Sequence, residues 1–329
     1  MTASEILAAI PKLNTLVLGD ICLDRWCIYD PGTAAPSRET GIARVGVVST
    51  ETTPGAAGTI ASNVIALGIP RVTLLGAIGD DGHGFELLRA LRLGGISVDL
   101  CVVSSLIPTF TYTKLINAVT GVEDLPRIDY ISTQPLPLEV EELLLDRLQS
   151  YIEAFDVVLV SDQAETESGG MVTPAIRRSL ARLAIEFPEK IIWVDSRMRP
   201  EHFRNVVIKP NRDEAAAACM RQFGVVDLGK LRRDTNAPYM LMTDGADGVV
   251  IVREGGEIRV KTKPEPHPVD ICGAGDSFSA GAATALAVTA DPIQAARFGN
   301  MVASVTIMKK GTGTASPEEV LAAERNWPE

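Results

Sequence analysis

The most chemically informative segment of the chain is Val269–Ala283, whose sequence is VDICGAGDSFSAGAA. Gly273, Ala274 and Gly275 precede Asp276 and a helix-forming run, which predicts a tight turn leading into a helix N-terminus. The backbone N–H groups of such a turn, together with the helix dipole, can bind an anion. We expect Asp276 at the N-cap beside that anion, although GxGD taken alone is more often simply the start of a capped helix.

Several familiar phosphate- and metal-binding patterns are absent from the sequence. There is no GxxxxGK[ST] segment, which excludes a P-loop, and the GxGxxG pattern fails because Phe278 occupies the position of the third glycine. None of the three histidines has the spacing to another histidine or cysteine that a zinc site requires. The five cysteines include no CxxC pair, so we expect buried thiols and, for any metal ion, oxygen ligands.

Polar residues also follow two predicted strands. Asp20 and Asp24 come after residues 14–19, at the carboxyl edge of a sheet, where α/β proteins bind ligands. A carboxylate at that edge can accept hydrogen bonds from hydroxyl groups. Further along, the NRDE of residues 211–214 is typical of a helix start with an N-cap and an acidic first turn.

Composition and charge limit the class of protein. The chain has 329 residues, 46% hydrophobic and 22% charged, which is enough for a large core and unlike a disordered or fibrous chain. Its net charge of −11 repels nucleic acid and anionic membranes. No basic stretch precedes the first apolar run, and no apolar run reaches about 18 residues. We therefore expect a cytoplasmic protein without nucleic-acid or membrane partners, in which a phosphorylated substrate needs a local basic pocket.

Short β-branched segments alternate with longer segments of helical apolar spacing. This alternation predicts an α/β fold, a mainly parallel sheet flanked by helices on both faces. The predicted strands are 14–19, 71–78, 156–161, 190–195, 206–209 and 239–243. The predicted helices are 57–67, 84–92, 138–154, 173–186, 213–223, 276–287, 292–308 and 317–324.

Two regions, about 20–52 and 100–132, interrupt the alternation. They contain Thr-rich alternating segments such as 109–116 (TFTYTKLI), which favour half-exposed antiparallel strands. We expect these regions to form a small β-sheet lid over one edge of the main unit. After Gly248 a hairpin is predicted, with its turn at Gly255 and Gly256. Since no polar linker divides the chain, we expect residues 1–329 to form a single domain.

Motifs in a fixed order resemble those of the ribokinase-like (PfkB) carbohydrate kinases. Asp270–Asp276 (DICGAGD) is similar to their C-terminal signature and opens a Gly- and Ala-rich helix as theirs does. The resemblance covers about residues 13–323 and implies an ATP-dependent carbohydrate kinase of ribokinase-like fold. The other landmarks are Gly19–Asp20, PGAAG at 54–58 followed by Asn63, GDDGHG at 79–84, NRDE at 211–214 and TDGADG at 243–248.

This resemblance implies catalytic and cofactor roles for particular residues. Asp276 is implied to be the general base that takes the proton from the attacking sugar hydroxyl, and the N–H groups of residues 273–275 to form an anion hole for the transferred phosphoryl group. Asn211 and Glu214 match an NxxE element that orders Mg²⁺ near the ATP phosphates, and a need for a monovalent cation stays open. The implied nucleotide-binding residues are Asn211, Thr243, Gly245, Gly248, Gly273, Gly275 and Gly311.

For the sugar, the resemblance implies contacts from the first strand end, the PGAAG segment and the lid. The lid residues Lys114, Arg127 and Asp129 add cations and an acceptor, although a solvated strand face has the same composition. Lid strands in this family commonly pair between subunits, so a homodimer is also implied. The expected substrate-binding residues are Asp20, Gly55, Thr59, Asn63, Lys114, Arg127 and Asp129.

Finer similarity relates the chain to the kinase domain of bacterial heptose 7-phosphate kinases. These enzymes phosphorylate the anomeric hydroxyl of D-glycero-D-manno-heptose 7-phosphate, and the similarity covers their kinase domain alone. The similar segments are GDICLDRW at 19–26, SRE at 37–39, PRID at 126–129, VVLVSDQA at 157–164, WVDSR at 193–197, IKPNRDE at 208–214 and KKGTGTASPEEV at 309–320.

Departures from that pattern leave the sugar open. Those kinases have PGGAAN where residues 54–59 are PGAAGT, so Ala56 replaces a glycine and Thr59 a substrate-binding asparagine. SRE lacks the proline-rich continuation, and Ile271 and Cys272 replace threonines. Pockets that hydrogen-bond their substrates discriminate strongly between them. The alternatives are another kinase of this family, acting on fructose, ribose or fructose 6-phosphate, and a catalytically silent sugar- or nucleotide-sensing protein.

Overall fold

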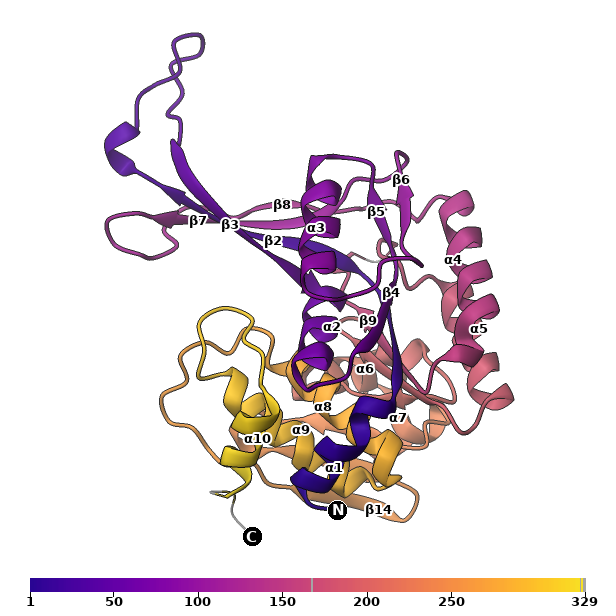
Figure 1. The fold of residues 1–329 in the computed structure, drawn as a ribbon. Coiled ribbons are helices and arrows are strands. Elements are labelled where there is room, and N and C mark those ends of the chain that lie inside the picture. The colour runs from indigo at the N-terminus through magenta and orange to yellow at the C-terminus, as the bar shows by residue number, and fades with distance from the viewer. Residues whose placement is uncertain (167, 326, 328–329) are drawn as a thin grey trace.

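The chain folds around an eight-stranded sheet in the computed structural model, which describes residues 1–166, 168–325 and 327 (Figure 1). Six neighbouring strands, from β4 to β12, are parallel, and β13 and β14 extend the sheet as an antiparallel hairpin. The mainly parallel sheet expected from the sequence is therefore confirmed. In spatial order the strands are β14 (Gly256–Val260), β13 (Val249–Arg253), β12 (Met240–Thr243), β11 (Val207–Ile208), β10 (Ile191–Ser196), β9 (Val157–Asp162), β1 (Asn14–Gly19) and β4 (Arg71–Leu75).

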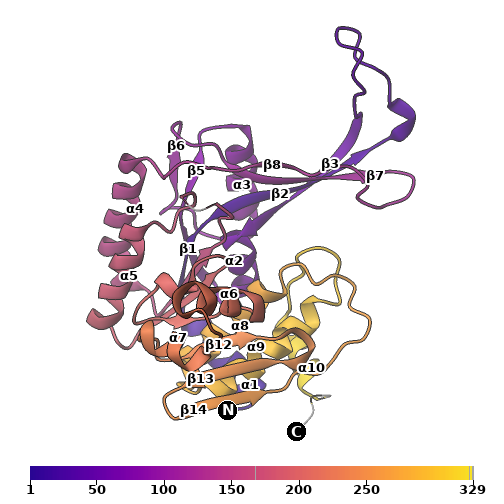
Figure 2. The same cartoon turned by 180° about the vertical axis from the view of Figure 1, so that it is seen from behind.

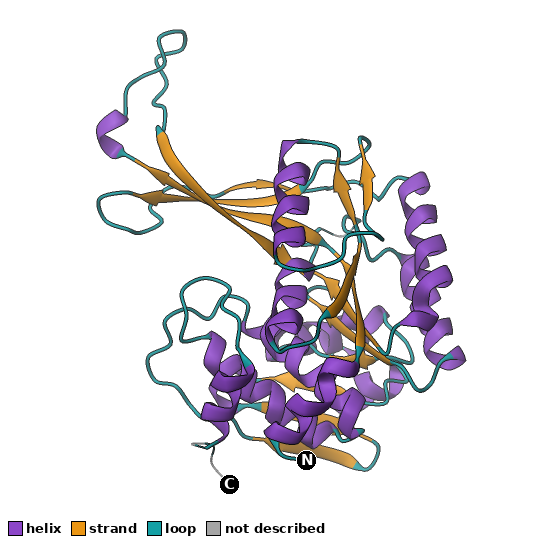
Figure 3. Ribbon diagram, in the orientation of Figure 1, coloured by secondary structure: helices purple, strands orange, loops and turns teal. Residues whose placement is uncertain are grey.

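Helices cover both faces of this sheet, as Figure 3 shows. Side chains alternate across the sheet, so on β1 Val17 packs into one core and Leu16 and Leu18 into the other. No helix of the described residues is long and apolar enough to cross a bilayer. One layer holds α1 (Ala3–Ala9), α2 (Ala57–Ala66), α3 (Gly82–Leu93), α8 (Ala274–Thr289), α9 (Pro292–Thr306) and α10 (Pro317–Glu324), and the other α4 (Leu138–Tyr151), α5 (Pro174–Glu186), α6 (Arg212–Phe223) and α7 (Leu228–Asp234).

A separate four-stranded sheet projects from the main body, as Figures 1 and 2 show from opposite sides. We call it the lid sheet, and its order is β3 (Val47–Ala56), β2 (Ile21–Tyr29), β7 (Phe110–Asn117) and β8 (Ile128–Tyr130). β2 is antiparallel to β3 and parallel to β7. The small sheet expected from regions 20–52 and 100–132 is thus confirmed, with β3 continuing beyond the expected boundary. The parallel pairing of β2 with β7 corrects the expectation of antiparallel strands.

The structure differs from the sequence prediction in a few local elements. The strand predicted at 71–78 breaks at Gly76 into β4 and β5 (Ala77–Gly79), and β5 pairs instead with β6 (Val102–Ser104). A Cβ at Gly76 would lie 2.5 Å from the Gly19 carbonyl oxygen, so the close approach of these two segments requires glycine. The hairpin turn lies at residues 254 and 255, one residue earlier than predicted, and helices α1 and α7 were not predicted.

Functional side chains collect at the carboxyl edge of the parallel strands, where the lid sheet joins the main sheet. This is the edge at which open α/β sheets bind ligands, because side chains that follow neighbouring strands meet there. The residues that end or directly follow these strands are Asp20 after β1, Gln163 after β9, Arg197 after β10, Lys209 after β11 and Thr243 at the end of β12.

Candidate active site

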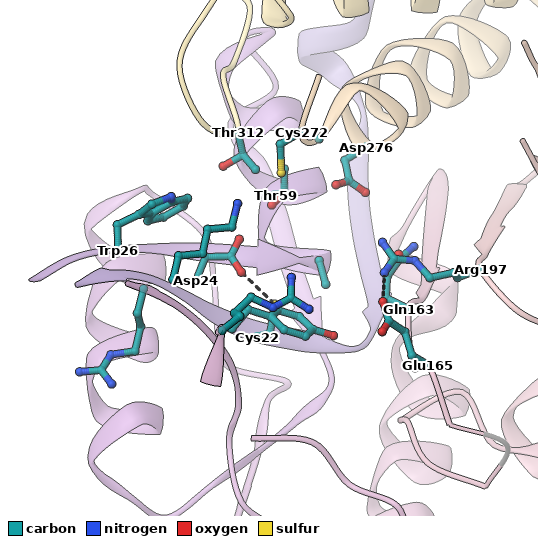
Figure 4. Close-up of a pocket in the computed structure, with 16 residues that line it drawn as sticks. Cys22, Asp24, Trp26, Thr59, Gln163, Glu165, Arg197, Cys272, Asp276 and Thr312 are labelled. Atoms are coloured by element: carbon teal, nitrogen blue, oxygen red, sulfur yellow. Dashed lines mark hydrogen bonds and ion pairs between the residues drawn. The ribbon is translucent and has the colours of Figure 1, made fainter. Parts of the chain in front are cut away.

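A cavity of about 170 Å³ lies between the lid sheet and the beginning of α8. Asp24 and Trp26 of β2 line it from the lid, and Asp276 and Thr59 line it from the helical side (Figure 4). Arg197 and Glu165, which form an ion pair, close a third side. We call this the acceptor cavity, since its polar walls combine carboxylates with cations. The other lining residues are Cys22, Arg25, Ala56, Tyr112, Lys114, Arg127, Gln163, Cys272, Gly273 and Thr312.

The turn before α8 places its first residues at the cavity wall. Gly273 has a φ of 76°, in the left-handed region that glycine favours, and it is the N-cap. Asp276 is therefore the third residue of the helix, which corrects the expectation that it would be the N-cap. The Ala274 N–H already donates to the Ile271 carbonyl (3.2 Å), whereas the N–H groups of Gly275 and Asp276 belong to a first turn that has no acceptors inside the helix.

The carboxylate of Asp276 is held in an environment that favours its protonated form. Loss of solvation, reinforced by the negative charge of Asp195, raises the pKa of Asp276 to about 7, against the lowering effect of Lys209 and Arg197. A carboxylate with this pKa is poised to accept a proton near neutral pH. Its partly exposed side chain faces the acceptor cavity, so the accepted proton can come from a bound hydroxyl group.

Behind Asp276 lies a buried ion pair that the sequence analysis missed. Lys209 Nζ lies 2.8 Å from Asp195 Oδ2, and both side chains are under a tenth exposed. The Ser279 hydroxyl of α8 donates to the same carboxylate oxygen (3.2 Å), which ties the pair to the helix. Asp195 and Lys209 end or follow apolar strands, the same signal that had singled out Asp20.

Asp24, not Asp20, is the carboxylate of the first strand connection that lines the acceptor cavity. Asp20 is 1% exposed, and its oxygens accept the N–H groups of Gln163, Ala164 and Met171 at 2.7–2.9 Å. The structure thus corrects the expectation of a sugar contact at Asp20, because its carboxylate instead anchors the segment after β9. Burial raises the pKa of Asp24 to about 6, although Lys114 and Arg127 lower it.

The cationic side chains Lys114 and Arg127 of the lid region form part of the cavity wall. Lys114 is 6.0 Å from the ring centre of Trp26, and Arg127 is 5.0 Å from that of Tyr112. Asp129 pairs with Arg127 at 2.7 Å and does not itself line the cavity. Cation–π contacts of this kind hold the two cations over aromatic faces while leaving N–H donors for a ligand.

The PGAAG segment joins β3 to α2 and lies against Asp24. A Cβ at Gly55 would lie 2.5 Å from Cys22 Sγ and 2.6 Å from Asp24 Oδ2, so glycine is needed for this approach. Ala56 has a φ of 52°, a conformation that costs a non-glycine residue about 1 kcal/mol or more. Thr59 lines the cavity and donates to the Pro54 carbonyl, whereas Asn63 is fully buried and donates to the Thr59 carbonyl, which corrects its expected substrate contact.

A second cavity, of about 360 Å³, adjoins the first across the start of α8. We call it the nucleotide cavity, after the expectation that Thr243, Gly245 and Gly248 bind a nucleotide; its lining is largely apolar, and it borders the first turn of α8. Thr243, Gly245 and Gly248 line it, together with Ala274 and Gly275. The sequence analysis missed its wall on α9, made by Asn300, Ala303 and Ser304.

Gly311 lies outside the nucleotide cavity, contrary to expectation. Its N–H donates to Asp270 Oδ2 at 3.1 Å, which draws the loop of residues 309–313 toward the acceptor cavity, where the next residue, Thr312, is part of the wall. The loop therefore contributes to the acceptor side of the site. Of the cysteines, Cys272 is exposed and lines the same cavity, whereas the other four are buried as expected.

Asn211 and Glu214 form a reciprocal capping box at the start of α6. The Glu214 N–H donates to Asn211 Oδ1 (2.8 Å), and the Asn211 N–H donates to Glu214 Oε2 (2.7 Å). The described residues contain no group of three or more His, Cys, Asp or Glu arranged to hold a metal ion. One carboxylate and one amide oxygen nevertheless fit Mg²⁺, which keeps several waters and takes its remaining ligands from phosphates.

Asn211 pairs with Thr243 by an isolated parallel bridge, so the capping box lies beside the edge of the nucleotide cavity. Burial raises the pKa of Glu214, and Lys209 lowers it. The junction of the two cavities is thus surrounded by the ammonium of Lys209, by the N–H groups of the first turn of α8, and by three carboxylates. The carboxylates are those of Asp195, Glu214 and Asp276. This arrangement suits the transfer of a charged group between two bound molecules.

Comparison with known proteins agrees with this architecture. Residues 45–319 match the model of the pfkB family of carbohydrate kinases, so the chain belongs to that family and is a carbohydrate kinase. Among curated proteins it is 29% identical over 328 residues to the bifunctional protein HldE of Pelobacter propionicus and 30% identical over 338 residues to that of Caulobacter vibrioides, covering 97% of this chain in both. The chain spans 64% and 65% of the lengths of these two relatives.

Solved structures show the same fold. Phosphofructokinase-2 of Escherichia coli in complex with potassium superposes with a TM-score of 0.73 at 18% identity, covering 95% of this chain and 99% of that one. A ribokinase of Arabidopsis thaliana complexed with ribose and ATP gives 0.69 at 18% identity, with the same coverage. The ribokinase-like fold expected from the sequence is thereby confirmed.

Proposed function

We propose that this carbohydrate kinase transfers the γ-phosphoryl group of ATP to a hydroxyl of a sugar phosphate, and that the sugar phosphate is a heptose 7-phosphate. The observation that carries the proposal is the contact of two cavities at one helix start, with Asp276 on the acceptor side and Gly275 on the nucleotide side. A group passing between the two bound molecules crosses the positive end of α8.

Asp276 accepts the proton of the attacking hydroxyl in this proposal. Its pKa of about 7 allows it to be ionised in a working enzyme and still basic enough to take a proton as the new O–P bond forms. The unpaired N–H groups of the first turn of α8 stabilise charge on the transferred phosphoryl group. The protein thus positions two reactants and compensates charge, as phosphoryl transfer requires.

Mg²⁺ fits the side-chain oxygen atoms of Asn211 and Glu214, with waters and phosphates as its further ligands, and when bound it would neutralise charge on the nucleotide phosphates. Lys209, paired with Asp195, adds a fixed positive charge on the protein side of the same junction. Lys209 and Asp195 need not move for this role, because Lys209 directly follows β11 and Asp195 is the last residue but one of β10, the neighbouring strand of the main sheet.

The phosphate of the acceptor is best received by the cations of the lid. Lys114 and Arg127 reach the acceptor cavity from β7 and from the start of β8, and Arg197 reaches it from the end of β10. In a chain of net charge −11 this grouping brings positive charge to the wall of the acceptor cavity. Arginine suits a phosphate because its planar fork donates two parallel hydrogen bonds.

A heptose is favoured over smaller sugars by the similarity to the HldE proteins and by the segments shared with heptose 7-phosphate kinases. The second candidate is a different sugar or sugar phosphate, such as fructose 6-phosphate, fructose or ribose. Thr59 favours this second candidate, because its hydroxyl already donates to the Pro54 carbonyl and reaches less far than an asparagine amide.

The test is release of ADP from ATP and Mg²⁺ by the full chain, with a panel of acceptors. We expect turnover with D-glycero-D-manno-heptose 7-phosphate and at least tenfold lower kcat/KM with fructose 6-phosphate, fructose and ribose. Arg127→Gln should raise KM for the heptose phosphate about tenfold or more while changing KM for ATP little.

Sedoheptulose 7-phosphate, which carries the same terminal phosphate on a ketose, is the matched control for recognition of the sugar itself. Preference for fructose 6-phosphate, fructose or ribose would contradict the heptose assignment and leave the kinase chemistry intact. No turnover with any acceptor, while ATP still binds, would favour a sensing role.

We also propose that the lid sheet pairs with a second copy of the chain. Ile42, Val45, Val47 and Val48 are 43–70% exposed on and beside β3, which is an edge strand of the lid sheet. Exposed apolar edge strands pair readily with another chain. Light scattering is expected to give twice the chain mass of 35.1 kDa, and Val48→Glu to shift the protein toward monomer. A monomeric wild-type mass would contradict the pairing.

A further inference from the structure

A pocket of about 320 Å³ lies beside α5, on the opposite layer from α8 and sharing no lining residue with either cavity of the active site. Its polar wall consists of Arg177 and Arg178 of α5 together with His202 and Arg204, which end and follow the 3₁₀ helix of residues 200–202. We propose that this pocket binds the phosphate groups of a small, multiply charged anion.

Two of the three arginines of the pocket, Arg177 and Arg204, are held in place by backbone carbonyls. Arg177 donates to the Val172 carbonyl (2.7 Å) and lies 5.9 Å from the ring centre of Phe203. Arg204 donates to the carbonyls of Glu201 (2.6 Å) and Phe203 (2.9 Å). Each guanidinium has five N–H donors, so both retain donors for a ligand, and their fixed geometry reduces the entropy lost on binding.

The positive charge of the pocket is only partly balanced by neighbouring carboxylates. Arg204 pairs with Asp234 at 3.3 Å, on the exposed surface. Glu201 is buried, but its carboxylate is engaged by Arg221 at 2.6 Å. Arg178 has neither a hydrogen bond nor an ion pair within the described part of the chain, and its side chain is exposed at the pocket rim.

Arg199 and Asp162, which lie outside the pocket wall, also act on Arg177 through their charges. Arg199 is engaged by Asp162 at 2.7 Å, yet it still contributes to repulsion at Arg177, whose pKa is lowered chiefly by burial. Burial, assisted by Arg177, Arg204 and Arg199, also lowers the pKa of His202, against the effect of Glu201. A bound anion would relieve this repulsion, because it supplies the negative charge that the pocket lacks.

Phosphate is the chemistry that this wall recognises best. Arginine forks match the oxygen spacing of phosphate groups, and the dipole of the thirteen-residue α5 adds positive potential at Pro174. A long polyanion is disfavoured by the net charge of −11, which repels it everywhere outside the pocket. A small compound with one or two phosphate groups fits both conditions, whether inorganic or carried by a metabolite.

The proposal is tested by following the histidine ring protons of the full chain by NMR, with inorganic pyrophosphate as the probe. The chain has three histidines, and His202→Gln identifies the resonance of His202. We expect pyrophosphate to raise the pKa of His202 and to leave the ring-proton chemical shifts of His267 unchanged. Sodium chloride at the same ionic strength should raise it much less, since screening alone does not occupy the pocket.

Arg178→Gln is expected to raise the pyrophosphate concentration that gives half of the His202 shift by about tenfold or more, because one charge-assisted hydrogen-bonded pair is lost. Arg182→Gln, on the same helix but outside the pocket, is the matched control and should leave the shift unchanged. Both variants should keep the kcat of the wild type, since neither residue belongs to the active site.

A comparison of pyrophosphate with fructose 1,6-bisphosphate separates an inorganic ligand from a phosphorylated metabolite, according to which raises the pKa of His202 at lower concentration. Three outcomes overturn the proposal: no shift of His202 with either compound, an equal shift with chloride, or an unchanged shift in Arg178→Gln.

Discussion

Replacing Asp276 by asparagine is expected to lower kcat for sugar phosphorylation by about 10²–10⁴-fold, with KM for both substrates changing little. The amide keeps the size of the side chain and its hydrogen-bonding reach into the acceptor cavity, but it cannot take the hydroxyl proton. Initial rates of ADP release at saturating substrates measure this effect. Asp146→Asn, an exposed position on α4, is the matched control and should retain wild-type kcat.

The pH dependence of kcat in the wild type and in Asp276→Asn gives an independent check on the role of Asp276. Because the base must be ionised and its pKa is about 7, kcat of the wild type should rise with pH through about 7 and then level off. If Asp276→Asn retained more than a tenth of wild-type kcat, or if the wild-type profile were flat from pH 6 to 8, the assignment of the base would be wrong.

Asp276 also affects stability, with the opposite sign from its effect on activity. Its pKa in the folded chain lies above the ordinary aspartate value of 3.8, so the folded state binds its proton more tightly than the unfolded state. The resulting stability is fully present below about pH 4 and is lost as pH rises through about 7. Asp276→Asn should therefore melt higher than the wild type at pH 8, and the difference in Tm should shrink toward pH 4.

Replacing Lys209 by methionine is expected to destabilise the fold by roughly 3–5 kcal/mol at pH 7.5. The substitution leaves Asp195 buried without its partner, 2.8 Å from where the ammonium was, and only the Ser279 hydroxyl remains as a donor to that oxygen. Urea unfolding measures the loss. Lys12→Met, an exposed lysine, should change stability by less than about 0.5 kcal/mol.

A second variant separates the buried charge from the packing of the lysine. In Lys209→Met/Asp195→Asn neither side chain of the former ion pair carries a charge, so most of the lost stability should return. Because Lys209 lowers the pKa of Asp276, the single variant should also move the rise in kcat to higher pH. An unfolding free energy equal in the single and double variants would show that the ion pair does not carry the effect.

Sequence reasoning located the start of α8 because glycines, a carboxylate and a helix-forming run are contiguous there. It could not find the Lys209–Asp195 pair, since the two residues meet only through the register of β10 and β11. It placed both Asp20 and Asp24 at the sheet edge but assigned the sugar contact to Asp20, because a strand end predicts position and not whether a carboxylate turns toward solvent or toward backbone N–H groups.

The same distinction applies to the nucleotide cavity and to the fold. Thr243 ends β12 and Gly248 lies in the turn after it, so both could be placed from the sequence. Asn300 and Ser304, by contrast, lie on a helix whose packing partner is not evident from its own pattern. The alternation of strands and helices was sufficient to predict the main sheet. The break at Gly76 was not evident, because an apolar run continues through it and only the approach of Gly19 requires it.

β1 ends at Gly19 and β2 begins at Ile21, so at this crossing a single residue separates the rigid body from the projecting lid sheet. Asp20 is held by hydrogen bonds from its backbone and its side chain. Its N–H donates to the Ser161 carbonyl, its carbonyl accepts the Ala57 N–H, and its carboxylate accepts N–H groups of the segment after β9. β2 then runs for nine residues, about 30 Å at the usual rise. Because β2 is long and its start is held firmly, a rotation of the strand by about 5° about Asp20 would displace its far end by about 2–3 Å.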